Sequence, residues 1–260
     1  MNVHQQIFYH QSLSNMLNSE KITREFKRIQ SLGFIKSNRA NNTGIGKTFE
    51  DYLGVRENNS KDHDFEGFEV KSQREMATSY ITLFTKNPTH PRGANRVLKD
   101  TYGKPDAHFP QVKVLHTSIF GDRFNTFNSQ FGFKMKVDNV NKKLLMDIKN
   151  LETDTLYEND IYWDFNKIQG KKLDNTFVVW ADRKYENGIE YFHYTRANVY
   201  YGFSFERLIE GVKNSYVMFD IRMGSYKSGI NIGKPHDHGS GFRVKRDYLK
   251  TLFDGYVEVE

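Results

Sequence analysis

The stretch DHDFEGFEVK, residues 62–71, places four carboxylates near a lysine and sets apolar side chains between them. Like charges on one face of a strand repel each other, so this density of acids needs a counter-charge. Glu69 and Lys71 are two residues apart and share one face of a strand, whereas Phe68 and Val70 point to the other face, into a core. The pattern predicts a strand that carries an acid and an amine side by side.

Asp64 precedes Glu69 by five residues, an odd number, so on one straight strand the two carboxylates would point to opposite faces. A turn at Glu66–Gly67, with the glycine free of backbone restriction, would fold Asp64 back beside Glu69. Two carboxylates placed in this way can hold Mg²⁺ through oxygen ligands, with Lys71 next to the metal-bound water or the scissile phosphate. Such a set suits phosphodiester hydrolysis, which needs an oriented water and positive charge that stabilises the transition state.

The motif is short, and a solvated acidic surface is the alternative interpretation. Its surroundings favour a site, because a short helix that carries Glu50 precedes it and a strand follows it. Glu50 is a further candidate, either to orient the lysine or to bind a second ion. The segment GIGKT, residues 44–48, resembles the end of a phosphate-binding loop, but Asn41 stands where that loop needs its first glycine.

Composition limits the protein class. The chain has 260 residues, with 38 Lys and Arg against 32 Asp and Glu, a formal charge of +6. This balance suits a polyanionic partner, although an ordinary basic enzyme is an alternative. There is no cysteine, which excludes disulfides and thiolate sites and suits a reducing interior. The sequence has no run of about 18 apolar residues, so we expect no membrane span. The N-terminal residues do not resemble a secretion signal. We expect a soluble intracellular protein.

Periodicity gives a coarse order of elements. Helices and a few strands come first and many short strands follow, which predicts an α/β-type lobe and then a β-rich lobe, with a boundary near residue 105. The predicted elements are a helix over 12–32 that ends at Gly33, neighbouring strands over 65–71 and 79–85, a loop over 87–96, short strands from 111 onward, a helix over 203–213 and a glycine-rich polar loop over 224–243.

Five blocks of the sequence together closely resemble the MvaI and BcnI family of type II restriction endonucleases, which is itself related to the mismatch-repair nickase MutH. The resemblance covers roughly residues 40–105 and 215–245, and residues 110–210 do not align. The blocks are NTGIGKTFEDYLG (42–54), DFEGFEVKSQRE (64–75), TLFTKNPTHPRGAN (82–95), DIRMGSYKSG (220–229) and GKPHDHGSGFR (233–243).

The resemblance implies an α/β (α+β) chain with a PD-(D/E)xK nuclease core, in which a mixed sheet flanked by helices carries the catalytic groups. Residues 1–105 would form the catalytic lobe and 106–260 the β-rich DNA-recognition lobe. His63 stands where the motif's name has proline, a departure that the family tolerates. The catalytic residues would be Glu50, Asp64, Glu69 and Lys71, with one or two Mg²⁺ ions held by Asp64 and Glu69.

A second group matches the family's base-reading residues. Arginine donates two hydrogen bonds to guanine, aspartate accepts one from cytosine, and histidine donates to guanine. Zinc binding by the two histidines of HDH, or a plain polar loop, are the alternatives. The predicted base contacts are Asp220, Arg222, His236, Asp237, His238 and Arg243. Backbone or minor-groove contacts are predicted for Lys86, Arg92 and Arg96, with a solvated basic loop as the alternative.

The expected function is therefore Mg²⁺-dependent, sequence-specific cleavage of double-stranded DNA at a short, GC-rich, pseudosymmetric site, by a monomer that cuts one strand at a time. We expect the protein to act in a prokaryotic cytoplasm and to have no membrane partner. A cognate DNA methyltransferase is expected to act on the same DNA site. The alternatives are a MutH-like strand nickase and a non-catalytic sequence-specific DNA-binding protein.

Overall fold

The computed structural model describes residues 19–40, 43–55, 64–75, 80–170 and 173–259. The chain forms two compact units, both of which combine sheet and helix, so the fold class is α+β as predicted. Unit 1 comprises Met1–Thr78, Lys172–Phe203 and Phe253–Glu260, and unit 2 comprises Ser79–Lys171 and Ser204–Leu252. The units are therefore built from interleaved segments. The predicted functional division, with catalysis in 1–105 and DNA recognition in 106–260, has different bounds and stays a prediction.

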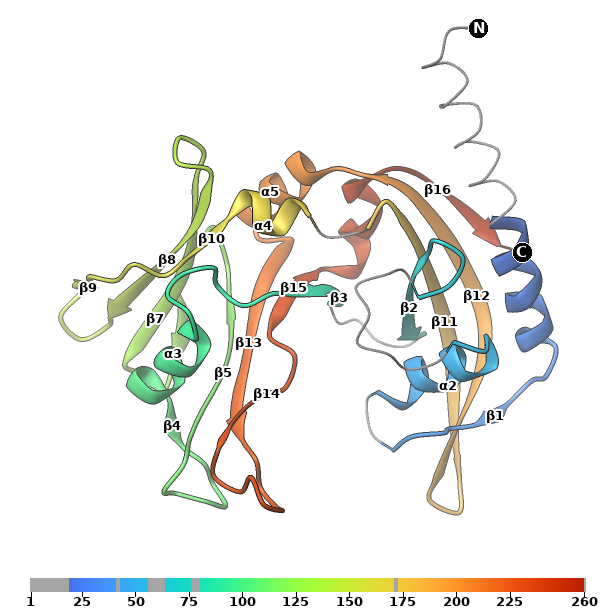
Figure 1. Ribbon diagram of the computed structural model, residues 1–260, viewed down its shortest axis with the longest axis horizontal. Helices are drawn as coiled ribbons and strands as arrows, with labels where there is room; N and C mark the ends of the chain where they lie inside the picture. Colours follow the sequence, from blue (N-terminus) through green and yellow to red (C-terminus); the bar gives the residue numbers. More distant parts are fainter. Residues whose placement is uncertain (1–18, 41–42, 56–63, 76–79, 171–172, 260) are drawn as a thin grey trace, which may run out of the picture. The chain divides into compact units, whose positions relative to one another are not determined.

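Unit 1 is built on a mixed five-stranded sheet (Figure 1). Its order is β1 (Ile35–Lys36), β12 (Ile189–Phe203), β11 (Asn175–Glu186) and β2 (Glu69–Arg74), and β16 (Phe253–Val259) also pairs with β12. β11 and β12 form a long antiparallel hairpin, whereas β2 runs parallel to β11. Within the described residues β2 has β11 as its one neighbour, which makes it an edge strand of this sheet.

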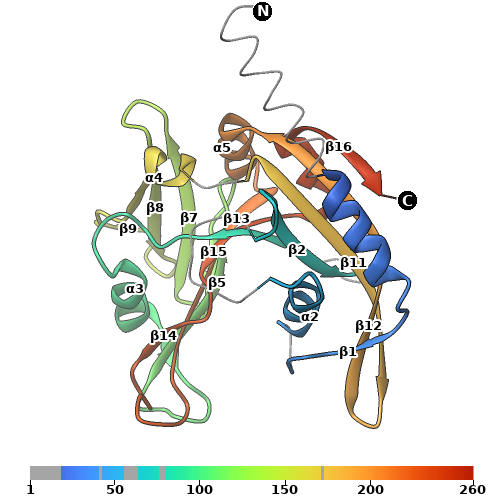
Figure 2. The ribbon, with the colours of Figure 1, turned by 45° about the vertical axis from the view of Figure 1, so that its right-hand side comes forward.

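Two helices cover the core of unit 1. One spans 19–30, where the predicted spacing of Ile22, Phe26 and Ile29 buries all three side chains completely; the predicted start of this helix, 12–18, lies outside the described residues. The other is α2 (Gly44–Tyr52), which lies beside β2 (Figure 2). Phe26, Phe49 and Phe68 all pack against Phe177 of β11, with ring centroids 6.1–6.5 Å apart. This aromatic cluster ties α2 and the start of β2 to the sheet.

Unit 2 contains two antiparallel sheets. The six-stranded sheet has the order β3 (Ile81–Thr85), β15 (Gly241–Val244), β13 (Val217–Ser225), β5 (Lys113–Ile119) and β4 (Lys104–Pro105), with β14 (Pro235–Asp237) paired to β13. The five-stranded sheet has the order β10 (Tyr162–Asp164), β8 (Lys143–Asn150), β7 (Phe131–Asp138) and β6 (Asn125–Phe127), with β9 (Leu156–Tyr157) on β8.

Trp163 joins the two sheets of unit 2. It is fully buried, and its indole packs against Phe219 of β13 and Phe242 of β15, with centroid distances of 4.7 and 5.9 Å. The other elements of unit 2 are the helices α3 (Ala94–Tyr102), α4 (Phe165–Gln169) and α5 (Phe205–Lys213) and the 3₁₀ helix η1 (Arg246–Leu252). Among the described helices of the chain, none has the length and apolar character needed to cross a bilayer.

Four predictions about elements need correction. The strand predicted over 65–71 is β2, Glu69–Arg74, because Phe65–Phe68 form a turn. β2 and β3 were predicted as neighbours, but β2 pairs with β11 and β3 pairs with β15. The predicted loop over 87–96 ends in the first residues of α3. The polar loop over 224–243 contains β14 and the start of β15.

Candidate active site

The turn predicted at Glu66–Gly67 is present. Phe65 and Phe68 exchange two backbone hydrogen bonds, with N···O distances of 3.1 and 2.8 Å. Both central residues have positive φ, 48° at Glu66 and 85° at Gly67, as in the type I′ turns that reverse a hairpin. A glycine at the second position adopts this conformation without steric cost. The chain therefore reverses immediately before β2.

The reversal brings Asp64 back to β2. Its Oδ2 accepts a hydrogen bond of 2.8 Å from the backbone N–H of Val70. The bond anchors the Asp64 carboxylate at the peptide group between Glu69 and Val70. The predicted turn was expected to return Asp64 to this part of the strand. This contact confirms the predicted turn, and the sharing of a metal ion by Asp64 and Glu69 stays a prediction.

Glu69 and Lys71 form an ion pair on one face of β2, in which the Lys71 ammonium donates to Glu69 Oε1. Both side chains are mostly shielded, with 27% of Glu69 and 14% of Lys71 exposed. The intervening Val70 and the preceding Phe68 are buried in the core of unit 1. The strand therefore holds an acid and an amine rigidly in a partly desolvated position, where electrostatic interactions are stronger than in water.

Glu50 lies on α2, which packs against β2. Tyr194 of β12 fixes this helix, because its buried hydroxyl donates a 2.7 Å hydrogen bond to the carbonyl oxygen of Ile45. Burial, followed by the charge of Glu50, raises the pKa of Tyr194 far above its usual value, so the hydroxyl keeps its proton. Glu50 itself is half-buried on α2.

The described residues contain no group of three or more His, Asp or Glu side chains arranged as a metal cage. Mg²⁺ does not require one, because it usually binds through one or two carboxylates and fills its octahedron with water and substrate phosphate. Asp64, anchored at the Val70 N–H, and Glu69, the first residue of β2, are carboxylates of the kind that such a site uses. The donors present thus fit a hard divalent cation.

The second predicted group lies in unit 2 and centres on Asp220 of β13. Its Oδ2 accepts a 2.6 Å hydrogen bond from Arg222 Nε, and Arg243 Nε lies 2.8 Å from the same oxygen, an ion pair without hydrogen-bond alignment. Asp220 and Arg243 are 11% and 12% exposed, whereas Arg222 is 46% exposed. One buried carboxylate thus holds two guanidinium groups.

Asp237 organises the loop that carries the two histidines. Its Oδ1 accepts hydrogen bonds from the backbone N–H groups of Gly239 and Ser240, and its Oδ2 accepts one from Asn95. The His236 and His238 rings meet edge to face with centroids 4.3 Å apart, and within the described residues they are not part of a metal-binding group.

His116 joins this cluster although it is not among the residues predicted from the sequence. It lies on β5 opposite Arg222, and its ring is 6.1 Å from that of His238. Burial, followed by Arg222, lowers the pKa of His116. A Cβ at Gly224 would lie 2.9 Å from His238 Nε2, so a glycine at this position leaves room for the imidazole. No local motif identifies His116, because only strand pairing brings it to β13.

The three predicted backbone-contact residues also lie in unit 2. The Lys86 backbone is tied down, since its N–H donates to the Ser240 carbonyl and its carbonyl accepts from Trp163 Nε1. Arg92 is exposed, and Arg96 is exposed beside Asp100, with an N···O distance of 3.5 Å.

The predicted catalytic residues are all in unit 1, and the predicted base-reading residues are all in unit 2.

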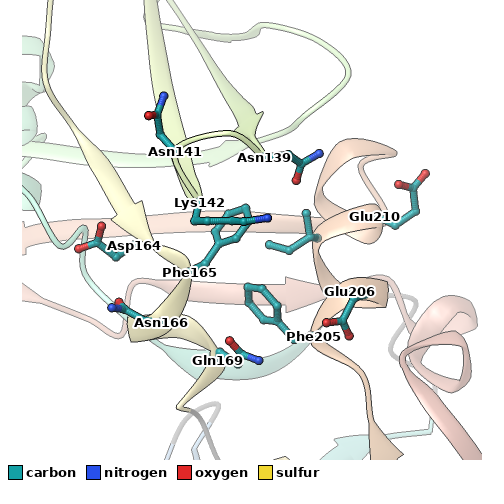
Figure 3. Close-up of a pocket in the computed structure, with 11 residues that line it drawn as sticks. Asn139, Asn141, Lys142, Asp164, Phe165, Asn166, Gln169, Phe205, Glu206 and Glu210 are labelled. Atoms are coloured by element: carbon teal, nitrogen blue, oxygen red, sulfur yellow. The ribbon is translucent and has the colours of Figure 1, made fainter.

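A cavity of about 720 Å³ in unit 2 contains none of the predicted residues (Figure 3). The β7–β8 turn, α4 and α5 enclose it, and the Phe165 and Phe205 rings pack together with centroids 5.3 Å apart. Its two glutamates are already hydrogen-bonded, Glu206 by Ser204 and Glu210 by Asn214. Since none of the acids and the lysine predicted for catalysis lines this cavity, we assign it no part in cleavage.

Comparison with known proteins gives one family and several solved structures. The sequence model of the MvaI/BcnI restriction endonuclease family matches residues 23–253. A structure of "Restriction endonuclease MvaI-cognate DNA substrate complex" superposes with a TM-score of 0.86 at 34% identity, covering 93% of this chain and 98% of the other. "Restriction endonuclease MvaI in the absence of DNA" gives a TM-score of 0.59 at 31% identity, with 94% and 98% covered. Among curated proteins there is no match.

Proposed function

The chain belongs to the MvaI/BcnI restriction endonuclease family and is a type II site-specific deoxyribonuclease, and from this we propose that it cuts double-stranded DNA with Mg²⁺, as a monomer, one strand at a time. The proposed target is a short, GC-rich, pseudosymmetric site. A solved structure of a relative, 34% identical over nearly the whole chain, is described as a complex with cognate DNA, which supports duplex DNA as the partner.

One observation carries the catalytic proposal: the turn at Glu66–Gly67 holds the Asp64 carboxylate against β2, next to the Glu69–Lys71 pair. We assign Asp64 and Glu69 to metal binding and Lys71 to the reacting phosphate. A bound Mg²⁺ would orient a water, lower its pKa and neutralise a phosphate oxygen. The Lys71 ammonium would stabilise the charge that develops in the transition state, and Glu50 would orient Lys71 from α2.

The base-reading proposal rests on the ion-paired cluster of unit 2. Arg222 is half exposed and hydrogen-bonded to Asp220 at only one of its nitrogens, so its outer N–H groups are available for guanine O6 and N7. The His236 and His238 rings lie beside it on β14 and the adjoining loop. Asp237 would act by holding the histidine loop, and Asp220 by holding the two arginines. Either carboxylate could also accept a hydrogen bond from cytosine.

The catalytic test compares variants in a plasmid digest. Lys71→Ala and Asp64→Ala should each reduce cleavage by a factor on the order of 10³, while binding of the same DNA without metal persists. Lys36→Ala, which removes an exposed lysine of the same unit, is the control and should cleave normally. Full cleavage by either site variant, or by the wild type in EDTA, would contradict the proposal.

The products of the digest test the remaining parts of the proposal. Sequencing the cut ends gives the target site and overhang. A monomer that cuts one strand at a time should produce nicked circles that then become linear without any added protein. Nicked circles that persist would instead indicate a MutH-like nickase, and a mobility shift without cleavage in Mg²⁺ would indicate a DNA-binding protein.

We further propose that the enzyme acts in a prokaryotic cytoplasm beside a cognate DNA methyltransferase. The reason is chemical, because a nuclease that cuts a short site also endangers the host genome unless those sites are modified. Methylating the sequenced target site in vitro should protect it from cleavage, and equal cleavage of methylated and unmethylated duplexes would contradict this part.

A further inference from the structure

His116 lies on the same face of the six-stranded sheet as two of the proposed base-reading residues. β5 and β13 are neighbouring antiparallel strands (Figure 1), and their register sets His116 opposite Arg222 and Ser118 opposite Asp220. Side chains that are directly opposite on such strands point to the same face. The Ser118 hydroxyl donates a 3.4 Å hydrogen bond to Asp220 Oδ1, as this register requires. The base-reading face therefore continues from β13 onto β5.

The other face of this strand pair belongs to the core of unit 2. Thr117 is opposite Ile221, Leu115 is opposite Met223, and all four side chains are buried. Because side chains alternate along a strand, His116 points outward, and its side chain is exposed. Packing of the core therefore does not explain a histidine at this position.

His116 stands at the end of a row of aromatic rings. The row consists of Tyr226, His236, His238 and His116, and the successive centroid distances are 4.2, 4.3 and 6.1 Å. A Cβ at Gly224 would lie 2.9 Å from His238 Nε2 and 3.7 Å from His116 Nε2. Both Nε2 atoms thus lie near the same position on β13, where the glycine leaves space.

The His116 ring has hydrogen-bonding groups that the protein does not use. Within the part of the chain that the structure describes, neither ring nitrogen has a hydrogen-bond partner. Partial burial, followed by the charge of Arg222, lowers the pKa of His116, so the ring stays neutral near pH 7. A neutral imidazole has one donor and one acceptor nitrogen. It can therefore donate to guanine O6 or N7, or accept from an amino group of cytosine or adenine.

We propose that His116 contacts a base edge of the target site, at most two base-pair steps from the guanine that Arg222 reads. This inference rests on the proposed function, since it takes Arg222 as a base-reading residue on duplex DNA. Opposite residues of neighbouring antiparallel strands have Cα atoms ~4.5–5.5 Å apart. Successive base pairs are ~3.4 Å apart along the duplex. The separation of the two residues is thus less than two base-pair steps.

His116→Ala tests the proposal, with His193→Ala as the matched control. His193 lies on β12 in unit 1, where its ring packs against Phe34 with centroids 5.5 Å apart. Both variants lose one imidazole. DNA binding is measured in EDTA, so that no metal ion contributes. The ligands are a duplex with the sequenced target site and a set of duplexes in which each base pair of that site is changed in turn.

His116→Ala should weaken binding of the target duplex roughly tenfold, and the wild-type penalty for changing one particular base pair should disappear. The penalties at the other base pairs should persist. The slope of log K against log salt should also persist, because no phosphate contact is lost. His193→Ala should match the wild type at every position. Wild-type penalties throughout in His116→Ala, or an equal loss of affinity for all duplexes, would overturn the proposal.

His116→Phe separates hydrogen bonding from ring packing. Phenylalanine keeps a ring beside His238 but has no ring nitrogen, so this variant should lose the same penalty as His116→Ala. Wild-type penalties in His116→Phe would show that the ring acts only by packing, and would overturn the proposal.

Arg222→Ala, measured in parallel, tests the proposed base reading separately. It should abolish the penalty at a G·C base pair that lies at most two steps from the one that depends on His116. A larger separation would overturn the inference. If Arg222→Ala changes one penalty and His116→Ala changes none, the inference alone fails. If Arg222→Ala leaves every penalty unchanged, the proposed base reading fails, and the inference fails with it.

Discussion

Gly67 determines where the carboxylate of Asp64 lies. Its φ of 85° belongs to the left-handed region, and the reversal there allows Asp64 to accept from the Val70 N–H. The turn was predicted from the sequence because Asp64 and Glu69 are an odd five residues apart, and only a turn between them could bring both carboxylates to one face. It did not predict that Glu66 would also take a positive φ of 48°, since a non-glycine residue in that region gives no sequence signal.

Gly67→Ala should cost roughly 1 kcal/mol of unfolding free energy, because a Cβ is strained at positive φ. It should also reduce cleavage by much more than it reduces DNA binding, because Asp64 would move from the start of β2. Urea denaturation and plasmid cleavage measure the two effects. Gly170→Ala is the control, since Gly170 has a φ of −71° and its Cβ would make an ordinary contact at 3.6 Å. Equal cleavage by both variants would refute the role of the turn.

Asp220 was predicted as a base-reading residue because the resemblance to the MvaI and BcnI family implied it. The structure adds that the same carboxylate lies against Arg243, which the sequence could not predict, because Arg243 reaches Asp220 only through the pairing of β13 with β15. Burial, followed by Arg222, lowers the pKa of Arg243. Asp220 is therefore needed to neutralise charge before any DNA arrives.

Asp220→Ala should destabilise the protein by roughly 3 kcal/mol, because it leaves Arg243 buried without its counter-charge. Guanidinium denaturation measures the change. Lys213→Ala, which breaks an exposed pair with Glu210, should change stability by less than about 1 kcal/mol. A loss in Asp220→Ala as small as the control's would show that water already compensates for Arg243.

α2 is the element whose placement matters most to the proposed chemistry, because it carries Glu50. The Tyr194 hydroxyl binds the first turn of α2 from β12, which is 149 residues away in the sequence. The amphipathic pattern predicted that the helix exists, but not what anchors it. In the same way, the helix predicted over 203–213 is present as α5, Phe205–Lys213. The sequence did not predict that β2 and β3 belong to different sheets, because that is decided by pairing with the distant strands β11 and β15.

Tyr194→Phe should cost about 1 kcal/mol of unfolding free energy, since it removes one buried hydrogen bond. If the hydroxyl also positions α2, kcat should fall by a larger factor than DNA affinity. Tyr201→Phe, on the same strand with a 46% exposed side chain, provides the comparison and should leave kcat unchanged. A kcat for Tyr194→Phe that equals that of Tyr201→Phe would restrict the hydroxyl to a purely structural role.

At the scale of the whole molecule, the two units are made of alternating segments, so composition along the chain could not reveal their bounds. A fragment of residues 1–105 contains only β1 and β2 of the unit 1 sheet, and each of these pairs with a strand that the fragment lacks. We expect this fragment to be unfolded by circular dichroism, without a cooperative thermal transition and without nuclease activity. A cooperative transition would show that the first 105 residues fold alone.

Stability should also depend on pH through the histidine cluster. Burial lowers the pKa values of His116 and His238 below the ordinary histidine value of about 6.5, so the unfolded chain binds more protons than the folded one just below that pH. The unfolding free energy should therefore fall as pH decreases from about 6.5 towards about 5, by less than about 1 kcal/mol because both rings are partly exposed. Denaturation of wild type and of a His116→Asn, His238→Asn variant checks this, and an identical pH profile for both would contradict it.

The interleaving of the units has a consequence for protein synthesis. β2 is complete early, but its partner β11 follows only after Ser79–Lys171 have been made. At ~5–20 residues per second, the nascent acidic turn waits roughly 5 to 20 s on the ribosome before it has a strand to join. During that interval the strand that carries the proposed catalytic pair has no partner in its sheet, so translation past β11 is required before the proposed centre can assemble.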